Sequence, residues 1–317
     1  MRQRVTQRKE NRQSMVLITG GTGVMGSVLV KRLAASGKKC RVLTLPGDPY
    51  VFRLAGCDVE IRYGDISRPE TVVGLCDGIS TVYHLAAIII AWDTSLFEKI
   101  NVLGTKNVLA EAQKSGVEHL VYISSASIIY PKPTTYSLSK RRCEELVRNS
   151  GIEYTIIRPT LVYDKRAGAE EFDAFCAYLY RFPIIPFVGP GTALKRPVFV
   201  DDIISGLCAL CDSTQARGKI YNFSGGEAIS ILEFARLCLR LMGKERTPVL
   251  CLPVWLCSAI ARAMGLVIKR PPLRWQVIAG MIQDANLDPA DACRDLGYNP
   301  AKVTEKLPEC FPRYFMK

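Results

Sequence analysis

The 317-residue sequence has few of the residue patterns that bind metal ions. It contains only two histidines, His84 and His119, and its twelve cysteines are scattered along the chain. Cys208 and Cys211 form a C-x-x-C, but no second pair follows at the spacing of a zinc site. We therefore expect no metal site, and we expect buried thiols that pack as small apolar groups. Many cysteines without a secretory signal are typical of a reducing cytoplasm.

An apolar signal segment is also missing from residues 1–14. Five basic residues stand there against the single acid Glu10: Arg2, Arg4, Arg8, Lys9 and Arg12. A secretory signal needs an apolar stretch of about 7–15 residues, and this segment has almost no apolar content. We expect residues 1–14 to form a basic, disordered tail, and we expect the protein to be cytoplasmic.

No apolar run is long enough to predict a membrane-spanning helix. The most apolar stretch, Val249–Ile268, is interrupted by Pro253, Arg262 and Gly265, whereas a span needs about 20 apolar residues. We expect a buried helix of a smaller lobe here. The alternatives are peripheral contact with a membrane through residues 249–268, or a wall of an apolar substrate pocket.

The chain is basic, with 42 Lys and Arg against 30 Asp and Glu and a formal net charge of +12. Such a balance favours anionic partners in general. The basic tail is short and has no interleaved aromatic residues, and no nucleic-acid-binding module is visible. We expect a small-molecule substrate and no nucleic acid.

A glycine-rich turn follows the first apolar segment. Met15–Thr19 has the pattern of a strand, Gly20, Gly23 and Gly26 follow at spacings of three, and residues 24–36 have the pattern of a helix. Glycines let the backbone approach a pyrophosphate closely, and a helix N-terminus offers it free N–H groups. This order of elements predicts a dinucleotide-binding site.

Strand and helix patterns alternate along the first half of the chain. Strands are predicted at residues 39–45, 59–62, 81–85, 120–124 and 154–158, and helices at 94–115 and 135–149. Such alternation predicts an α/β fold with a doubly wound parallel sheet, the Rossmann fold. We expect a dinucleotide-binding core over residues 15–165 and a smaller C-terminal substrate lobe over 166–317. Strands near 198–200 and 219–223 are expected to return to the core.

Two residues spaced by four suggest acid–base chemistry. Tyr136 and Lys140 would lie on one face of the helix predicted at 135–149. An ammonium lowers the pKa of a nearby phenol, which could then exchange a proton with an alcohol or a carbonyl. Ser124 and Ser125 end the preceding strand, where a hydroxyl can orient the reacting oxygen.

These ordered motifs resemble the extended short-chain dehydrogenase/reductase family of NAD(P)-dependent epimerases, dehydratases and 3β-hydroxysteroid dehydrogenase-like enzymes. The resemblance extends from Met15 to about Pro312 and includes the glycine turn, Gly64–Ile66, His84–Ala87, the helix led by Asn101, Ser124–Ser125, Tyr136 with Lys140, and Arg158–Tyr163. It implies catalytic roles for Ser125, Tyr136 and Lys140, with Asn101 supporting them. It implies cofactor contacts from Gly20, Thr22, Gly23, Val24, Met25, Gly26, Asp65, Ile66, Leu85, Ala86, Ala87, Ser124, Tyr136, Lys140, Pro159 and Val162.

The chain departs from the family pattern at the active-site entrance. Only eleven positions separate Ser125 from Tyr136, so the connection that shapes the entrance is short. Ala126 and Ser127 stand where the dehydratases carry an acidic pair, which argues against elimination of water. The cofactor can be NAD or NADP, because Asp48 lies just beyond the second strand and no basic residue ends that strand.

The sequence therefore predicts an oxidoreductase that moves hydride between a nicotinamide and a secondary alcohol or ketone. The apolar stretch 249–268 and the aromatic residues Phe172, Phe175, Tyr178 and Tyr180 motivate a steroid- or isoprenoid-like substrate, although their composition is also, and more often, that of the core of a lobe. One alternative is a nucleotide-sugar epimerase with Lys195 and Arg196 on a diphosphate, unless these two lie in a solvated turn. Another is a non-catalytic subunit that keeps a bound dinucleotide. A homodimer is also expected.

Overall fold

The computed structural model describes residues 15–166, 168, 170–211 and 213–311. The tail predicted for residues 1–14 lies outside this part of the chain. A seven-stranded parallel sheet forms the centre, with the strand order β11-β6-β5-β4-β1-β2-β3. The strands are β1 (Met15–Thr19), β2 (Cys40–Thr44), β3 (Val59–Tyr63), β4 (Ile79–His84), β5 (His119–Ile123), β6 (Glu153–Pro159) and β11 (Lys219–Phe223).

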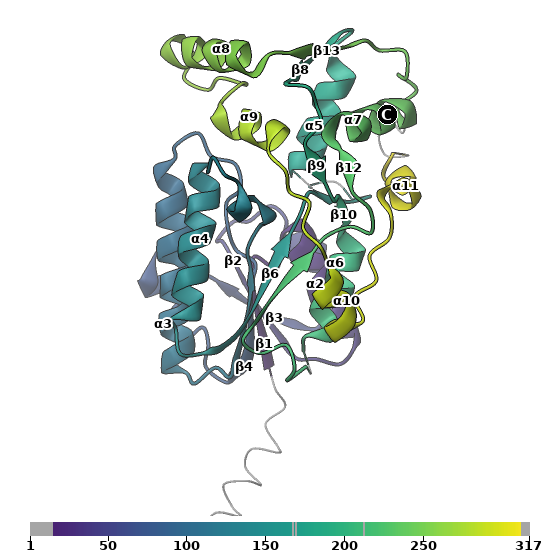
Figure 1. Ribbon diagram of the computed structural model, residues 1–317. Coiled ribbons are helices and arrows are strands. Elements are labelled where there is room, and N and C mark those ends of the chain that lie inside the picture. The colour runs from purple at the N-terminus through teal and green to yellow at the C-terminus, as the bar shows by residue number, and fades with distance from the viewer. Residues whose placement is uncertain (1–14, 167, 169, 212, 312–317) are drawn as a thin grey trace, which may run out of the picture.

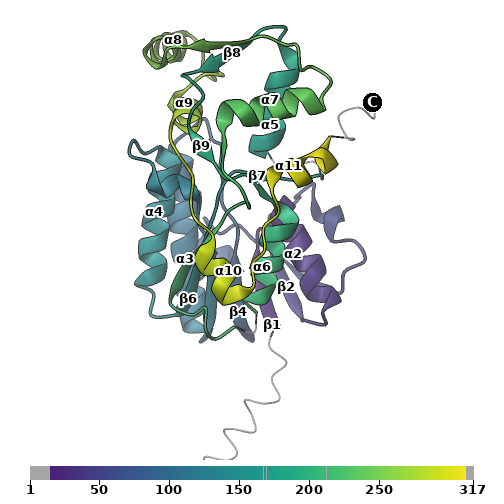
Figure 2. The ribbon, with the colours of Figure 1, turned by 45° about the vertical axis from the view of Figure 1, so that its right-hand side comes forward.

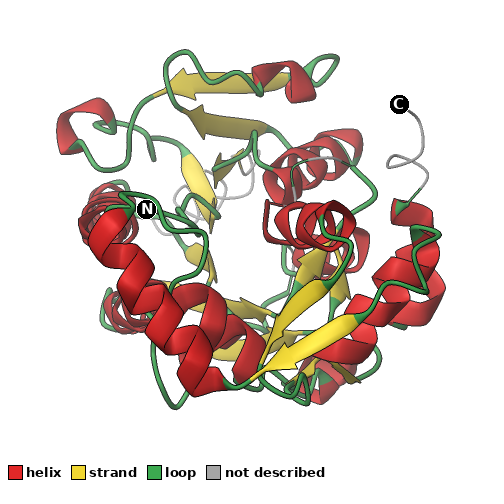
Figure 3. Ribbon diagram, turned by 90° about the horizontal axis from the view of Figure 1, so that it is seen from above, coloured by secondary structure: helices red, strands yellow, loops and turns green. Residues whose placement is uncertain are grey.

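Helices cover both faces of this sheet (Figures 1 and 3). The helices α3 (Gly104–Lys114) and α4 (Thr135–Arg148) lie on one face, and α2 (Val24–Ala35), α6 (Val200–Ala209) and α10 (Ala290–Leu296) lie on the other. Side chains alternate along each strand, so Val16 and Ile18 of β1 pack toward α2 whereas Leu17 packs toward α3. The sheet thus has an apolar core on each side, as a doubly wound fold requires.

The remaining α-helices and the short strands form a smaller lobe above the carboxyl ends of the main sheet (Figure 2). Its helices are α5 (Glu170–Arg181), α7 (Ile231–Leu241), α8 (Val254–Val267), α9 (Trp275–Ile282) and α11 (Val303–Lys306). Three two-stranded sheets connect them: β7 (Val162–Tyr163) with β10 (Val198–Phe199), β8 (Ile185–Val188) with β13 (Val249–Leu252), and β9 (Leu194–Lys195) with β12 (Ile229–Ser230). Short helical turns η1 (Val51–Leu54), η2 (Pro69–Thr71), η4 (Ala126–Ile129) and η5 (Leu307–Cys310), and the π-helical segment η3 (Phe97–Leu103), complete the described chain.

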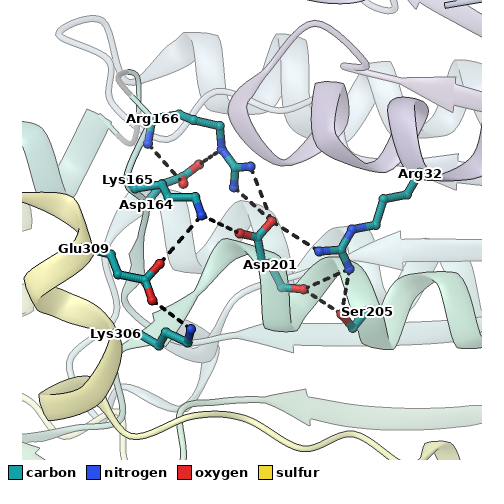
Figure 4. A network of polar contacts seen from close by, with 8 residues as sticks. All are labelled: Arg32, Asp164, Lys165, Arg166, Asp201, Ser205, Lys306 and Glu309. Carbon is teal, nitrogen blue, oxygen red and sulfur yellow. Dashed lines mark hydrogen bonds and ion pairs between the residues drawn. The ribbon is translucent and has the colours of Figure 1, made fainter. Parts of the chain in front are cut away.

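A polar network connects α2, the helix that follows β1, to the C-terminal part of the chain (Figure 4). Arg32 of α2 donates to Ser205 and pairs with Asp201, both on α6. Arg166 also pairs with Asp201, and Lys165 lies between Asp201 and Glu309. Segments more than 270 positions apart are therefore held together by charge as well as by apolar packing.

The helix expected within residues 249–268 is present as α8, but the prediction that it is buried is wrong. In α8 only Cys257 is buried, whereas Trp255, Leu266 and Val267 are 72%, 88% and 87% exposed. One narrow side of the helix packs against α9. Its other sides are exposed to solvent in the described part of the chain. Both Figure 1 and Figure 2 show it at the outer edge of the lobe.

Candidate active site

The glycine turn lies where the strand order reverses, between β1 and β4. Doubly wound sheets bind their ligands in the crevice at this point. Gly20 has φ +69°, and a Cβ on it would lie 2.9 Å from the backbone nitrogen of Ala86. A Cβ on Gly26 would lie 2.1 Å from the carbonyl oxygen of Gly20. Both positions therefore need glycine, and the turn is pressed against the Leu85–Ala87 segment that follows β4.

The N-terminus of α2 opens into this crevice. Gly23 is its N-cap, and no side chain caps this end of the helix. Val24 and Met25 begin the helix, and their side chains pack against the core. Free N–H groups at a helix N-terminus, approached by glycine backbone, are the arrangement that binds a pyrophosphate. The described residues at this turn fit a dinucleotide.

Asp48 reaches back from beyond β2 to the glycine turn. Its Oδ2 accepts hydrogen bonds of 2.5 Å from the hydroxyls of both Thr22 and Thr44. Burial raises the pKa of Asp48, but the hydrogen bonds from Thr22, Thr44 and the Tyr50 amide outweigh it and hold that pKa below its usual range. Arg53 donates to the carbonyl oxygen of Thr22. An ionised carboxylate and a guanidinium therefore both border the place where the adenosine ribose of a dinucleotide lies in this fold.

Asp65 and Ile66 follow the edge strand β3. The Asp65 carboxylate accepts from the backbone N–H of Ser67, and Ile66 is buried against Gly104 at the start of α3. A Cβ on Gly104 would lie 2.7 Å from the Ile66 side chain, so a larger residue here would have to displace that side chain. The structure thus places both residues at the same edge of the sheet as the glycine turn.

A buried histidine supports the wall between the turn and α3. His84 Nδ1 lies 2.7 Å from the Thr19 hydroxyl, and its Nε2 lies 3.0 Å from the Thr105 hydroxyl. Burial, with a smaller contribution from the charge of Lys140, lowers the pKa of His84 to about 3. His84 is therefore neutral at physiological pH and serves to position Thr19, which accepts from the Ala86 amide.

Asn101 connects this wall to α4. It lies in the π-helical segment η3, a geometry that often occurs at functional sites. Its side chain accepts from the Ile88 amide and donates to the Ile88 carbonyl and to the Ser139 hydroxyl. Asn101 is 1% exposed, so it supports the site from below rather than facing a substrate.

Tyr136 and Lys140 lie on one face of α4, near the end of β5. A capping box between Thr134 and Ser137 fixes the start of this helix and so the direction of the Tyr136 side chain. Lys140 is 3% exposed, and its Nζ donates to the Ile123 carbonyl at 2.8 Å and lies 4.9 Å from the ring centre of Tyr122. Burial lowers the pKa of Lys140 to about 8, against the charges of Cys143 and Glu144, which raise it.

The expected lowering of the Tyr136 pKa by Lys140 is not found. Burial raises the pKa of Tyr136 above its ordinary value, the charge of Glu171 adds to this, and a hydrogen bond with Ser125 acts in the opposite direction. The phenol is therefore protonated at neutral pH and can donate a proton. Ser125 also accepts from the Ser127 amide, so its hydroxyl is held beside the phenol.

Ser124 lies beneath the site and not in it. Its hydroxyl donates to Glu144 at 2.5 Å, and its side chain is buried. Arg158, at the end of β6, makes a two-pronged ion pair with the same carboxylate, with N···O distances of 2.9 and 2.7 Å. Sequence analysis did not identify Glu144, although its spacing of four from Lys140 places it on the same face of α4.

Pro159 and Val162 follow in the same segment. Pro159 ends β6, and Val162 begins β7, which leaves the main sheet to pair with β10 of the lobe. The polypeptide therefore crosses from the core to the lobe immediately beside Arg158. The predicted contact residues thus gather at one edge of the sheet, at the carboxyl ends of β1, β3, β4, β5 and β6.

Two groups of predicted substrate contacts have other roles. Phe172 and Phe175 pack into the lobe core against Phe234, and Tyr180 is 58% exposed. Lys195 is buried and donates to the Gln283 carbonyl and the Tyr130 hydroxyl, so the interpretation of a solvated turn is wrong there. Phe172, Phe175 and Lys195 therefore stabilise the lobe, and their positions do not indicate a substrate.

All twelve cysteines lie in the described part of the chain, and none of them forms a disulfide. Across residues 15–311, as far as the structure describes them, no three His, Cys, Asp or Glu side chains gather where they could hold a metal ion. Not one helix in the described part of the chain has the length and apolarity to cross a membrane.

Comparison with known proteins agrees with this geometry. The sequence profile of the NAD-dependent epimerase/dehydratase family matches residues 16–224. The chain is 28% identical to a 3β-hydroxysteroid dehydrogenase/Δ5→4-isomerase of Mycobacterium tuberculosis, over 94% of this chain and 90% of that one. It is 25% identical to 4-hydroxy-2-methyl-3-oxo-4-farnesyl-3,4-dihydroquinoline-1-oxide ketoreductase of Stigmatella aurantiaca, over 89% of this chain and 90% of that one.

The fold is shared with solved structures. One is UDP-glucuronic acid 4-epimerase of Bacillus cereus in complex with UDP-glucuronic acid and NAD, with a TM-score of 0.74 and 20% identity over 95% of this chain and 98% of that one. The predicted α/β fold and the predicted resemblance are therefore confirmed. The chain belongs to the NAD-dependent epimerase/dehydratase family, which also confirms the predicted class of enzyme, an NAD(P)-dependent oxidoreductase.

Proposed function

We propose that this protein transfers hydride between a nicotinamide cofactor and a secondary alcohol or ketone of an apolar, steroid- or isoprenoid-like substrate. The observation that carries the proposal is that the Ser125 side chain lies within reach of the Tyr136 phenol at the carboxyl end of β5, with Lys140 one turn further along α4. The relatives named for steroid and farnesyl-quinoline substrates support the substrate class, because the chain spans about nine-tenths of each.

The residues around the site have the following proposed roles in cofactor binding and hydride transfer. The glycine turn and the N-terminus of α2 hold the pyrophosphate, and Asp65 with Ile66 holds the adenine end. Lys140 would hold the nicotinamide ribose, Leu85–Ala87 and Pro159–Val162 would lie against the nicotinamide, and Ser124 and Asn101 position these residues. The bound nicotinamide supplies or accepts the hydride. Ser125 orients the substrate oxygen, and the protonated Tyr136 donates its proton to a carbonyl oxygen as that oxygen gains charge.

We further propose that the cofactor is NAD rather than NADP. Asp48 is held ionised by the Thr22 and Thr44 hydroxyls at the end of β2. A carboxylate at this place accepts a hydrogen bond from a ribose hydroxyl and repels a 2′-phosphate. The guanidinium of Arg53 would attract a 2′-phosphate and so favour NADP. However, it already donates to the Thr22 carbonyl and lies over the ring of Tyr50.

The Tyr136→Phe variant tests the reaction. We expect kcat for reduction of an apolar ketone, such as a 3-ketosteroid, to fall by about 10²–10⁴-fold, because the proton donor is lost. Affinity for NADH, measured by fluorescence titration, should stay within about twofold, since the ring remains. Tyr154→Phe, at the far end of β6, is the matched control and should turn over normally.

Other outcomes would favour the alternatives. Turnover of UDP-sugars, and not of apolar ketones, would identify a nucleotide-sugar epimerase, for which the shared fold is the support. Tight NAD binding without turnover of either class would favour a non-catalytic subunit. Equal activity of the wild type and Tyr136→Phe would refute the assigned proton donor. The homodimer and the cytoplasmic location stay predictions.

A further inference from the structure

We propose that α8 and the basic residues after it dock into the interface of an anionic lipid membrane, with the entrance of the active site facing the bilayer. The docking stands independently of the proposed activity, whereas delivery of an apolar substrate from the membrane rests on that function. The occupant that we assign to this face is a lipid surface.

The apolar residues of α8 are exposed on the sides that α9 does not cover. Cys257 faces α9 within a cluster that includes Val254 and Ala261. Trp255, Ile260, Leu266 and Val267 are exposed on the remaining sides. A helix that is apolar all round is normally buried, so this one has an uncovered apolar surface.

The charge around this surface fits an anionic partner. Between Glu245 and Asp284 the sequence has no acidic residue, and five basic residues stand in the interval: Arg246, Arg262, Lys269, Arg270 and Arg274. Arg262, Lys269 and Arg270 are exposed on α8 or directly after it. Apolar residues beside clustered Lys and Arg are the composition of interfacial helices that bind anionic lipids.

The dimensions fit a helix that lies in the membrane surface. The 14 residues of α8 are fewer than the roughly 20 that a crossing needs. A second copy of this chain is a poorer occupant. In a two-fold interface the same patch meets itself, so the exposed cations of Arg262, Lys269 and Arg270 would face one another without an acid between them.

The segment after α8 places this surface beside the entrance of the active site. Arg274 donates to the Ala91 carbonyl and lies 4.2 Å from the ring centre of Trp92, which follows the wall at Ala86–Ala87. Trp275 donates to the Pro133 carbonyl, three residues before Tyr136.

Gln283, at the end of α9, exchanges two hydrogen bonds with the backbone of Lys132. The loop that precedes Tyr136 and the loop that follows β4 are therefore both held by the segment that follows α8. Figure 1 shows α9 between α8 and the top of α4.

Vesicle co-sedimentation of the full chain tests the docking. We use vesicles of phosphatidylcholine alone and of phosphatidylcholine with about one-third phosphatidylglycerol. We expect at least tenfold tighter binding to the anionic vesicles at low salt, and a clear loss of this preference in 0.5 M NaCl. Trp255→Glu combined with Leu266→Glu should abolish binding, and Lys269→Glu combined with Arg270→Glu should remove the anionic preference.

Val73→Glu is the matched control, because Val73 is 59% exposed in the turn between η2 and β4, outside the lobe that carries α8. It should bind as the wild type does, and thermal melting checks that each variant is folded. The proposal is overturned if the wild type stays in the supernatant with both vesicles, or if all three variants bind alike. It is also overturned if light scattering shows a dimer that Trp255→Glu with Leu266→Glu dissociates, since a second copy would then cover the face. Reduction of a water-soluble ketone is measured in parallel and reports on the proposed function alone.

Discussion

Replacing Glu144 by Gln removes one charge from beneath the active site while keeping the shape of the side chain. The Glu144 side chain is 2% exposed, and it accepts from Ser124 and from two nitrogens of Arg158. Breaking a buried ion pair from one side costs about 3–5 kcal/mol, because the partner charge stays unpaired. Arg158 is 22% exposed and keeps some water, so we expect about 3 kcal/mol. With an unfolding entropy of about 0.6 kcal/mol/K for this chain length, Tm falls by about 5 °C.

The same change acts on Lys140. Burial lowers the pKa of Lys140 to about 8, and the charge of Glu144 works against this. Glu144→Gln therefore lowers that pKa further. Above the folded pKa, Lys140 loses its proton in the native state but keeps it in the unfolded chain up to about pH 10.4. The unfolded chain then binds more protons, so the contribution of Lys140 to stability rises with pH between these two values.

Activity should fall with pH over the range in which the contribution of Lys140 to stability rises. The charged form of Lys140 would hold the nicotinamide ribose, so kcat/KM of the wild type should fall as pH rises through about 8 and this charge is lost. In Glu144→Gln this alkaline limb should lie at lower pH. The pH at which kcat/KM falls reports on the charge of Lys140. A purely structural defect would lower the rate at every pH and would not move the alkaline limb along the pH axis.

Thermal melts at pH 7 and pH–rate profiles from pH 6 to 10 provide the measurements. Glu145→Gln is the matched control, because Glu145 is exposed on the same helix and should change neither Tm nor the limb. Glu144→Gln combined with Arg158→Met should recover part of the lost stability, since no buried charge is left unpaired. A Tm within about 1 °C of wild type for Glu144→Gln, or an unmoved alkaline limb, would refute this reasoning.

Two further predictions concern the glycine turn and the choice of cofactor. Gly26→Ala places a Cβ 2.1 Å from the Gly20 carbonyl oxygen, so it should cost about 3 kcal/mol and abolish the rise in Tm that NAD gives the wild type. Gly265→Ala in α8 meets no atom within 4 Å and should instead stabilise the chain by about 0.5–1 kcal/mol in denaturant titration; equal effects of the two changes would contradict the predicted turn. Asp48→Asn removes the charge that repels a 2′-phosphate, so the ratio of kcat/KM for NADPH to that for NADH should rise about tenfold or more. An unchanged ratio in steady-state assays would show that Asp48 does not select the cofactor.

Local patterns in the sequence were sufficient to predict the centre of the fold. The run from Met15 through Gly26 predicts strand, turn and helix because each needs residues that are close in sequence: β-prone apolar residues, glycines without Cβ, and a helix N-terminus. The structure has β1 and α2 at these places. The strand predicted at 154–158 and the helix at 135–149 are found as β6 and α4 within one residue at each end. Tyr136 and Lys140 could be found for the same reason, since helical periodicity places them on one face.

The electrostatics of the site depend on residues that are distant in sequence, and only the tertiary structure brought them together. Burial, and not Lys140, dominates the pKa of Tyr136, and Phe97 of η3 and Ser125 after β5 lie beside the phenol. Arg158 meets Glu144 because β6 lies beside β5. Asp48 meets Thr22 because the chain after β2 turns back.

The apolar stretch 249–268 shows most clearly what could not be predicted from the sequence alone. Its composition suits a buried helix and an interfacial helix equally, because hydrophobicity alone does not say whether a neighbour covers it. The sequence by itself determined which elements form and which residues lie on one face of each. The packing of the lobe decided that α9 covers only one side of α8, and so decided which apolar residues meet solvent.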